Sequence, residues 1–319
     1  MGGKTRTGRK ETFMRWEQLA ISPCNLCPRE CRIDRKNGQT GFCLMDDRIM
    51  VARAALHMWE EPCISGRSGS GTVFFSGCSL RCVYCQNYEI AAGKRGKQVS
   101  VGRLSEIFLK LQEKGAANIN LVTPDHYMTG VADAVLRAKE MGLVLPIVYN
   151  GSGYEKREVI EKLAGIVDIY LTDFKYMDSG LAARYSAAPD YPTVAKAALA
   201  EMAASVGMPV FDEEGMMKKG VIVRHLLLPG HKKNAREVLR YVYETYGDSV
   251  YLSLMNQYTP PERLKGNPDY EEICRKVTKR EYDAVADYAI ALGIRNAFIQ
   301  EGDTAKESFI PAFDGEGVC

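Results

Sequence analysis

Three cysteines lie close together in the run Gly77–Asn87, where Cys78, Cys82 and Cys85 follow the spacing C-x3-C-x2-C. Three thiolates on one short loop can each bind one iron of a [4Fe-4S] cluster, whereas electron-transfer clusters are normally held by four cysteines. The fourth iron would then be open to chelate a small molecule. The spacing also allows buried thiols or an incomplete zinc site, although zinc prefers four tetrahedral ligands.

A second group of cysteines precedes this loop, where Cys24, Cys27, Cys31 and Cys43 follow the spacing C-x2-C-x3-C-x11-C. Four thiolates are enough to complete a tetrahedral zinc site or to hold a second iron–sulfur cluster. The spacing differs from the ferredoxin run C-x2-C-x2-C-x3-C, so it does not decide between a zinc site and a second iron–sulfur cluster. Plain reduced thiols are less favoured, because the glycines and charged residues between them offer little core.

The chain has ten cysteines among 319 residues. Its first ten residues are basic and lack the apolar stretch of a secretory signal, and no apolar run approaches bilayer-spanning length. Clustered cysteines without a secretory signal indicate metal ligation in a reducing compartment rather than disulfides. We therefore expect a cytoplasmic protein. Cys63, Cys274 and Cys319 lack partner spacing and are expected to be inert packing or tail thiols.

Composition argues for one large domain with a small appendage, since 46% of the residues are hydrophobic. A formal net charge of +2 gives no electrostatic reason to expect a nucleic-acid or membrane partner. The N-terminal cysteines and the basic tail could instead form a metal-binding regulatory or nucleic-acid module. The basic residues lack the interleaved aromatic residues that stack on single strands, which disfavours nucleic acid.

Hydrophobic patterning predicts alternating strands and helices. The expected strands are 72–76, 118–123, 144–149, 166–174, 219–228 and 249–255, and the expected helices are 103–114, 129–141, 155–163, 193–206, 233–246 and 279–292. Thr278 and Glu281 are spaced as a capping box for the last helix. Six such units predict an α/β fold with a parallel sheet, either a barrel or a doubly wound open sheet.

The predicted strands also indicate where the three loop cysteines lie in the fold. The first expected strand, 72–76, ends directly before the Gly77–Asn87 loop, and ligands converge at the carboxyl ends of parallel strands. We expect residues 1–50 to form a tail and a small cysteine-rich, metal-binding module, with the main domain at 51–319. The proline-containing segment 256–278 is expected to be a surface excursion or a long loop.

The loop with Tyr84 between two cysteines resembles the signature of the radical S-adenosylmethionine (radical SAM) superfamily, C-x3-C-x-aromatic-C. Other stretches resemble pyruvate formate-lyase activating enzyme and, more closely, activating-enzyme-like proteins with an extra N-terminal cysteine segment. These stretches are Cys24–Cys31, His57–Gly66, Asn118–His126, Asp168–Tyr176 and Arg224–Gly230. The resemblance implies a partial (β/α)6 radical SAM barrel with a small N-terminal module, and it favours the barrel over the open sheet.

The resemblance also implies which residues bind S-adenosylmethionine. Tyr84 would lie against the adenine, and Asp173 and Lys175 would meet the amino and carboxylate groups of the methionine. Arg224 would lie near that carboxylate, for which a bidentate guanidinium is well suited. The structural alternatives are a packing aromatic for Tyr84, an ion pair between Asp173 and Lys175, and a rim salt bridge for Arg224.

The sequence departs from the family pattern at three places. Val122–His126 stands where most members carry a Gly-Gly-Glu stretch that grips the amine of S-adenosylmethionine, and Asp125 or His126 could supply that acceptor. Tyr149–Gly153 stands where the activating enzyme has an aspartate-containing turn associated with a monovalent cation, which puts that cation site in doubt. Gln86 stands where activating enzymes often have histidine.

The function implied by the resemblance is reductive cleavage of S-adenosylmethionine at a [4Fe-4S] cluster, giving methionine and a 5′-deoxyadenosyl radical that abstracts a hydrogen atom. A flavodoxin or ferredoxin would donate the electron, and the target would be a backbone glycine of a glycyl radical enzyme. The alternative is a radical SAM enzyme that modifies another protein, peptide or small molecule. No catalytic acid or base is assigned; His57, Glu60 and Glu61 are expected to cap or to form salt bridges.

Overall fold

The computed structural model describes residues 20–300 and 311–318. Nine strands follow one another across one sheet in the order β10-β9-β8-β6-β5-β4-β2-β1-β3, and β7 pairs with β8 at its side. The strands are β1 (Met50–His57), β2 (Ser70–Phe75), β3 (Lys97–Gln98), β4 (Ile119–Val122), β5 (Ile147–Gly151), β6 (Ile169–Asp173), β7 (Val210–Phe211), β8 (Met217–Leu226), β9 (Tyr251–Met255) and β10 (Ala297–Ile299).

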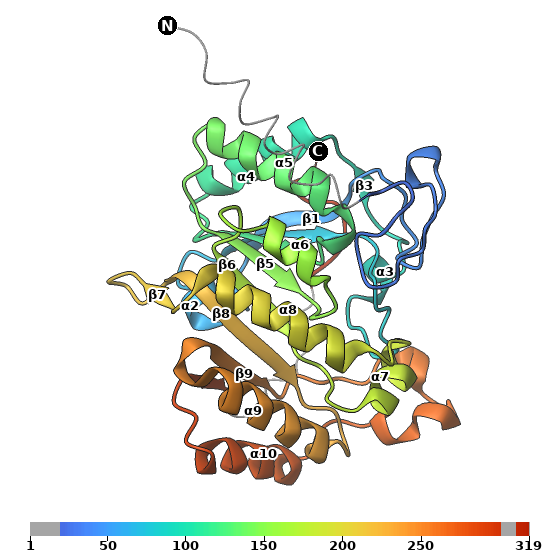
Figure 1. The fold of residues 1–319 in the computed structure, drawn as a ribbon, viewed down its shortest axis with the longest axis vertical. Helices are drawn as coiled ribbons and strands as arrows, with labels where there is room; N and C mark the ends of the chain where they lie inside the picture. Colours follow the sequence, from blue (N-terminus) through green and yellow to red (C-terminus); the bar gives the residue numbers. More distant parts are fainter. Residues whose placement is uncertain (1–19, 301–310, 319) are drawn as a thin grey trace, which may run out of the picture.

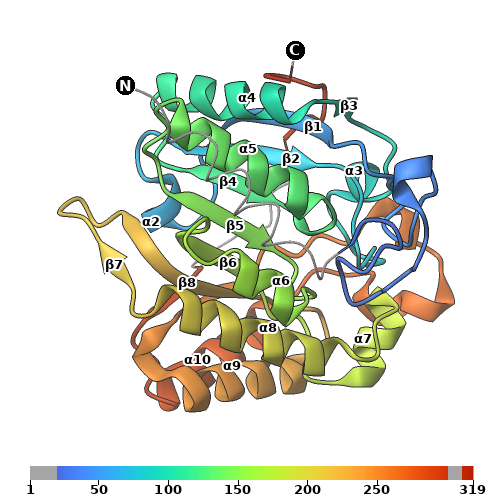
Figure 2. The same cartoon turned by 45° about the horizontal axis from the view of Figure 1, so that its top comes forward.

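Helices pack against this sheet, most of them on its outer face, as both ribbon views show (Figure 1, Figure 2). They are α2 (Pro62–Ser65), α3 (Tyr88–Ala91), α4 (Val101–Glu113), α5 (Met128–Glu140), α6 (Arg157–Lys162), α7 (Ser179–Ser186), α8 (Tyr191–Val206), α9 (Lys232–Tyr246) and α10 (Lys279–Ala291). Short 3-10 turns occupy Arg35–Asn37, Asp125–Tyr127, Gly247–Ser249, Glu262–Leu264 and Pro268–Ile273. All six predicted helices are present, and the capping box at the start of α10 is confirmed.

Seven strands run parallel, and their order decides between the two architectures that the sequence allowed. From β2 to β10 each strand pairs in parallel with the next one of the series β2, β4, β5, β6, β8, β9 and β10. A doubly wound sheet reverses its strand order at a switch point, whereas a barrel adds each strand on the same side. The uninterrupted order therefore confirms the predicted α/β partial-barrel fold. The six predicted strands are present as β2, β4, β5, β6, β8 and β9.

The sequence did not predict the element that borders this parallel series. β1 pairs with β2 in antiparallel fashion, and the chain end 311–318 lies along the other edge of β1. The Ala54 amide donates to the Glu316 carbonyl at 2.8 Å, and the Gly315 amide donates to the Ala52 carbonyl at 3.1 Å. The final residues thus cover an edge strand that would otherwise expose its backbone groups.

Apolar side chains fill the amino-terminal end of the barrel interior. Cys63 and Ile64, from α2, pack there against Val148, Ile169 and Ile222. Farther along β5 and β8, the next positions on the same side hold Asn150 and Arg224, whose side chains are hydrogen-bonded to each other. The interior is therefore apolar at one end and polar near the carboxyl edge.

Residues 20–49 form an irregular module with one 3-10 turn, beside α3 and α7 in both views (Figure 1, Figure 2). Its buried side chains Leu26, Cys43 and Met45 belong to the same apolar core as the sheet and the helices. The basic tail of the expected 1–50 unit, residues 1–19, lies outside the described residues. The described part of the module thus packs on the barrel through shared apolar contacts.

Candidate functional site

The loop with three cysteines begins directly after β2, at the carboxyl edge of the parallel strands. Gly77 has a φ of +88°, and a Cβ at this position would lie 2.8 Å from the Cys43 carbonyl oxygen. The chain can therefore turn here only with glycine. The turn places Cys78, Cys82 and Cys85 in the position that the sequence predicts, at the mouth of the barrel.

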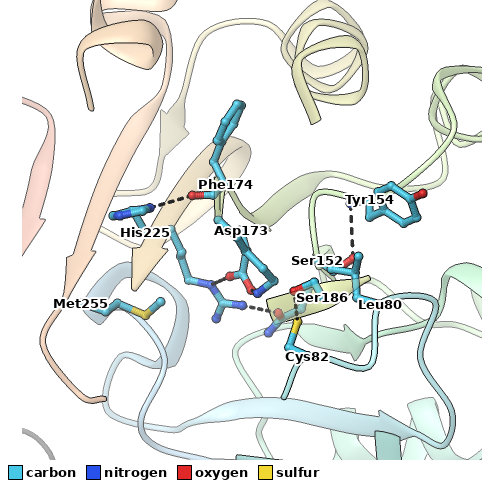
Figure 3. Close-up of polar contacts among 12 residues, drawn as sticks. Leu80, Cys82, Ser152, Tyr154, Asp173, Phe174, Ser186, His225 and Met255 are labelled. Carbon is cyan, nitrogen blue, oxygen red and sulfur yellow. Dashed lines mark hydrogen bonds and ion pairs between the residues drawn. The ribbon is translucent and has the colours of Figure 1, made fainter. Parts of the chain in front are cut away.

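Two of the three sulfur atoms accept hydrogen bonds. The Ser186 hydroxyl, at the end of α7, donates to Cys82 Sγ at 2.9 Å, as Figure 3 shows. The Leu80 backbone amide donates to Cys78 Sγ at 3.4 Å. Burial raises the pKa of Cys85 to about 11, helped by the neighbouring Cys82, while Lys175 acts in the opposite direction. Donors aimed at sulfur suit thiolates, and an ammonium group lies near enough to favour them.

Asp173, at the end of β6, is the centre of a buried charge network (Figure 3). It pairs with the Lys175 ammonium, and it accepts a hydrogen bond of 3.0 Å from Arg224 Nε on β8. Burial alone would raise the pKa of Asp173, but the two cations lower it overall. Asp173 and Lys175, two residues apart at the end of the strand, thus lie together as expected. They form the ion pair that was the alternative to direct binding of S-adenosylmethionine.

Arg224 contacts two further elements besides β6. Its Nη2 donates to Asn150 Oδ1 on β5 at 2.6 Å, and its Nη1 lies 3.4 Å from Glu60 Oε2. Glu60 Oε1 accepts a hydrogen bond from Asn120 on β4 at 3.1 Å. The expected salt bridge at Glu60 is therefore present. Sequence reasoning did not single out Asn120 and Asn150, although an amide within an apolar strand is a detectable signal.

The Tyr84 side chain, which comes from the loop, packs within a group of aromatic rings. Its side chain is 6% exposed, and its hydroxyl lies 2.7 Å from that of Tyr176. The rings of Tyr185 and Tyr258 meet it edge-on, with centroids 6.3 and 6.2 Å away. Packing thus accounts for the position of Tyr84, and the contact with adenine stays a prediction.

Asp125 and His126 follow β4 and are both buried. His126 Nε2 donates to the Ser76 carbonyl at 2.7 Å, and His126 Nδ1 lies 3.5 Å from Asp125 Oδ1. Asp125 Oδ2 has no hydrogen-bond partner among the described residues. Burial alone would raise the pKa of Asp125, but His126 and the Ser79 hydroxyl lower it overall. Both predicted acceptors keep a buried atom without a hydrogen-bond partner among the described residues, Asp125 Oδ2 and His126 Nδ1.

The turn after β5 is organised by Glu155 rather than by an aspartate. Glu155 Oε1 accepts a hydrogen bond of 2.9 Å from the Ser152 amide. Burial raises the pKa of Glu155 to about 8, and the nearby Asp125 adds to the effect. Gly153 has a φ of +80°, and a Cβ there would lie 2.1 Å from the Asp173 carbonyl oxygen. The turn therefore approaches the end of β6 closely.

Comparison with known proteins bears on this arrangement. The family model of the radical SAM superfamily matches residues 72–242, more than half of the chain. The chain belongs to the radical SAM superfamily. The matched region contains the three loop cysteines and the strands β6 and β8, which carry Asp173 and Arg224.

Two relatives of this radical SAM protein come from Methanocaldococcus jannaschii. Uncharacterized protein MJ0674 is 27% identical over 83% of this chain and 74% of its own length. Uncharacterized protein MJ0808 is 24% identical over 92% of this chain and 83% of its own length.

Among solved structures, Streptococcus suis SuiB bound to S-adenosylmethionine is 16% identical, with a TM-score of 0.45 over 72% of this chain. SuiB bound to the precursor peptide SuiA is also 16% identical, with a TM-score of 0.46 over 69% of this chain. The matched region spans 46% of the SuiB chain in both cases, so SuiB is much longer than the part that this radical SAM protein resembles.

The N-terminal cysteines of this radical SAM protein lie beside the loop Gly77–Asn87, called the cluster loop below. Cys24, Cys27 and Cys43 are buried, and Cys31 is half-buried and accepts a hydrogen bond of 3.3 Å from the Phe42 amide. Burial raises the pKa of Cys43 to about 11, although Arg35 acts in the opposite direction. Within residues 20–300 and 311–318, no three His, Cys, Asp or Glu side chains converge on one point as they do around a single metal ion. The metal of this module stays a prediction.

Arg29 joins this module to the cluster loop, a role that sequence reasoning missed. Its Nε donates to the Ser79 carbonyl at 2.8 Å, and its Nη2 donates to the Ser186 carbonyl at 3.1 Å. The guanidinium lies 3.9 Å from the centroid of the Phe42 ring. One side chain therefore fixes the module to both segments that approach Cys82.

The predicted excursion 256–278 contacts the cluster loop on another side. Arg263 Nη2 donates to the carbonyls of Val83 and Cys85, at 2.7 and 3.1 Å. Gln86 Nε2 donates to the Gln257 carbonyl at 3.0 Å. The backbone of the loop is thus held from outside by the excursion.

The remaining expectations concern isolated cysteines and membranes. Cys63 is buried in the barrel interior, and Cys274 Sγ lies 3.0 Å from the Leu264 carbonyl oxygen, as packing thiols do. Cys319 lies outside the described residues. None of the helices described in residues 20–300 and 311–318 has the length and apolar character needed to cross a membrane.

Proposed function

We propose that Cys78, Cys82 and Cys85 of this radical SAM enzyme hold one [4Fe-4S] cluster, and that Tyr84, Asp173, Lys175 and Arg224 bind S-adenosylmethionine. When bound, the cluster supplies the electron that cleaves the sulfonium to methionine and a 5′-deoxyadenosyl radical. The observation that carries the proposal is three cysteines on one loop at the barrel mouth, with hydrogen-bond donors aimed at two sulfur atoms.

The chain's own groups have three tasks in this proposal. The Ser186 hydroxyl and the Leu80 amide stabilise negative charge on the sulfur atoms of Cys82 and Cys78. Lys175 offers an ammonium group near Cys85. Asp125, which keeps a buried oxygen without a partner, offers an acceptor for an ammonium group where most family members use a Gly-Gly-Glu stretch.

We further propose that the substrate is a backbone glycine of a glycyl radical enzyme and that a flavodoxin or ferredoxin donates the electron. Support comes from the sequence stretches shared with activating-enzyme-like proteins. The second candidate is a radical SAM enzyme that modifies another protein, peptide or small molecule. Val122–His126 favours that candidate, because the region that grips the cofactor amine in most members is built differently here.

We also propose that Cys24, Cys27, Cys31 and Cys43 bind zinc or a second iron–sulfur cluster, and that the enzyme works in the reducing cytoplasm. Burial raises the pKa of Cys43 to about 11, so metal binding there must displace protons and weakens as the pH falls. Support for an iron–sulfur cluster at this position is the direct contact of the module with the cluster loop through Arg29.

The first test is anaerobic reconstitution followed by counting of iron and zinc and by assay of reductant-dependent 5′-deoxyadenosine. Wild type should form 5′-deoxyadenosine, and Cys82→Ala should not. Cys274→Ala is the matched control, because Cys274 packs in the excursion and is not among the proposed ligands. Equal product from Cys82→Ala and Cys274→Ala would refute the cluster assignment. Iron beyond four atoms per chain would support a second cluster, and one zinc would support the alternative.

The substrate is tested with pyruvate formate-lyase labelled with deuterium at the glycine Cα. Activase function predicts a protein-based glycyl radical in the electron paramagnetic resonance spectrum and deuterium in the 5′-deoxyadenosine. If 5′-deoxyadenosine forms without deuterium and without a protein radical, activation of that enzyme is refuted, and the search turns to other proteins, peptides and small molecules.

A further inference from the structure

We propose that Ser186 is a positioning residue that sets the reduction potential of the cluster through its hydrogen bond to Cys82, at the end of a hydroxyl chain that begins at Tyr84. This inference rests on the proposed function, because it assigns the iron–sulfur cluster to the loop cysteines. The Ser186 hydroxyl lies 2.9 Å from Cys82 Sγ, and the Tyr176 hydroxyl lies 2.8 Å from Ser186 Oγ. The Tyr84 hydroxyl lies 2.7 Å from that of Tyr176.

A bound cluster fixes the direction of this chain. A thiolate that binds iron carries no proton, so Cys82 Sγ can only accept, and Ser186 must give its single hydroxyl proton to sulfur. Ser186 Oγ then accepts from the Tyr176 hydroxyl, which in turn accepts from the Tyr84 hydroxyl. All three hydroxyl protons therefore point toward the sulfur, and each bond polarises the next.

The surroundings make this chain effective. Ser186, Tyr176, Tyr84 and Cys82 are 1%, 1%, 6% and 7% exposed, so water competes little for these bonds. Hydrogen bonds are electrostatically stronger in such a low-dielectric environment. Reduction adds negative charge to the cluster and its thiolates, and donors to sulfur stabilise that charge. The chain is therefore expected to raise the potential and to ease reduction of the cluster.

Local structure holds the Ser186 hydroxyl in place. Ser186 is the last residue of α7, and Ala187 ends the helix in the left-handed conformation with a φ of +49°. Arg29 Nη2 donates to the Ser186 carbonyl at 3.1 Å, and the Val83 amide donates to the Tyr185 carbonyl at 2.8 Å. The helix end is thus fixed to the N-terminal module and to the cluster loop at the same time.

The experiment measures the midpoint potential of the reconstituted full-length protein by redox titration monitored with electron paramagnetic resonance. Ser186→Ala removes the donor and should lower the equilibrium constant for one-electron reduction about threefold to tenfold, where tenfold corresponds to about 59 mV. Ser186→Thr keeps the hydroxyl and should restore a potential near wild type. Ser105→Ala is the matched control, because Ser105 is equally buried but donates to the Val101 and Ala134 carbonyls of α4 and α5.

A second readout separates this role from a general structural one. The reduced wild-type cluster should show a hydrogen–deuterium exchangeable proton coupling by electron–nuclear double resonance that Ser186→Ala lacks and Ser105→Ala keeps. Tyr176→Phe should shift the potential in the same direction by a smaller amount. This substitution removes the hydroxyl that donates to Ser186 Oγ and leaves the bond from Ser186 to Cys82 Sγ in place. Tyr176→Phe also carries the test if Ser186→Ala takes up no cluster.

Specific outcomes overturn the inference. The inference is wrong if Ser186→Ala has its full iron content and the same potential as wild type. If Ser186→Ala takes up no cluster, the inference is wrong when Tyr176→Phe has an unchanged potential. If these results accompany normal formation of 5′-deoxyadenosine by wild type, only the role of Ser186 fails. A wild-type protein that binds no iron refutes the cluster assignment of the proposed function, and the inference falls with it.

Discussion

At the scale of single residues, Arg224 connects three separate segments of the barrel. Its guanidinium contacts Asp173 on β6, Asn150 on β5 and Glu60 before α2, and its side chain is 15% exposed. Removing one partner from a buried charge network leaves the other charges without compensation. We expect Arg224→Met to lower the free energy of unfolding by about 3 kcal/mol, measured by urea denaturation.

The matched control for this variant is Arg240→Met, which removes a guanidinium from the exposed face of α9. Exposed substitutions of this kind change stability by at most about 0.5 kcal/mol. Equal stability of Arg224→Met and Arg240→Met would show that the network around Asp173 does not stabilise the fold. Loss of S-adenosylmethionine binding at unchanged stability would instead favour the cofactor role of Arg224.

Glu155 gives a pH-dependent prediction at the same scale. Burial raises its pKa in the folded protein to about 8, above the value of about 4.3 of an unfolded glutamate. Between these values the folded state binds more protons than the unfolded state, so the free energy of unfolding falls as the pH rises. Glu155→Gln keeps an oxygen for the Ser152 amide and lacks this titration. We therefore expect wild type to lose stability relative to Glu155→Gln from pH 5 to 8.5 in urea titrations, and parallel profiles would contradict the raised pKa.

The residue scale also shows what one sequence can and cannot reveal about a site. The neighbours Asp173 and Lys175 are predictable as a pair, because alternate residues of a strand share a side. The contact between Arg224 and Glu60 joins positions 164 residues apart, and it depends on how α2 fills the barrel. Ser186 carries no sequence signal at all, because its importance lies in being placed beside Cys82 by the end of α7.

At the scale of elements, segments with a clear hydrophobic pattern are predictable, and segments without one are not. The six predicted strands and six predicted helices all exist, with ends that differ by a few residues. β1 was missed because its sequence, MVARAALH, is rich in alanine, which favours helices. β10 and α2 have three and four residues, too few to show a period, and they form because the sheet edge and the barrel interior provide partners.

The capping box of α10 gives a prediction at this scale. Thr278 Oγ1 accepts from the Glu281 amide at 3.2 Å, and Glu281 accepts from the Thr278 amide at 3.0 Å. Thr278→Ala should cost about 1 kcal/mol of stability. The Arg275 guanidinium holds the pKa of Glu281 well below its usual range, so the contribution of Glu281 is present above about pH 4.3 and is lost as the pH falls further.

The measurement for this helix compares wild type with Glu281→Gln in urea titrations between pH 3 and 7. We expect wild type to be more stable near neutral pH and the difference to shrink below about pH 4.3. Glu262→Gln is a suitable control, because Glu262 is 84% exposed and pairs with the exposed Lys265 at the surface. A difference between wild type and Glu281→Gln that is constant with pH would exclude the ionic contribution.

At the scale of the whole molecule, both described ends of the chain pack near β1 and β2. The N-terminal module covers the loop that follows β2, and residues 311–318 run along β1 (Figure 2). β3 pairs with the start of β1 at Met50 and Val51, so the chain end continues the cover along the same strand. The parallel barrel strands are thus bordered by an antiparallel strand whose own edge is closed by the last residues.

Gly317 makes this closure testable. It has a φ of +73°, and a Cβ there would lie 1.9 Å from the Ala54 carbonyl oxygen, so Gly317→Ala should displace residues 311–318 from β1. We expect faster hydrogen exchange at the Ala54 amide, unchanged protection in β5 and β6, and concentration-dependent self-association through the exposed edge. Gly215→Ala is the control, because Gly215 has a similar φ of +78° but no atom within 4 Å of an added methyl group. If the Ala54 amide exchanges equally fast in Gly317→Ala and Gly215→Ala, residues 311–318 do not protect the edge of β1.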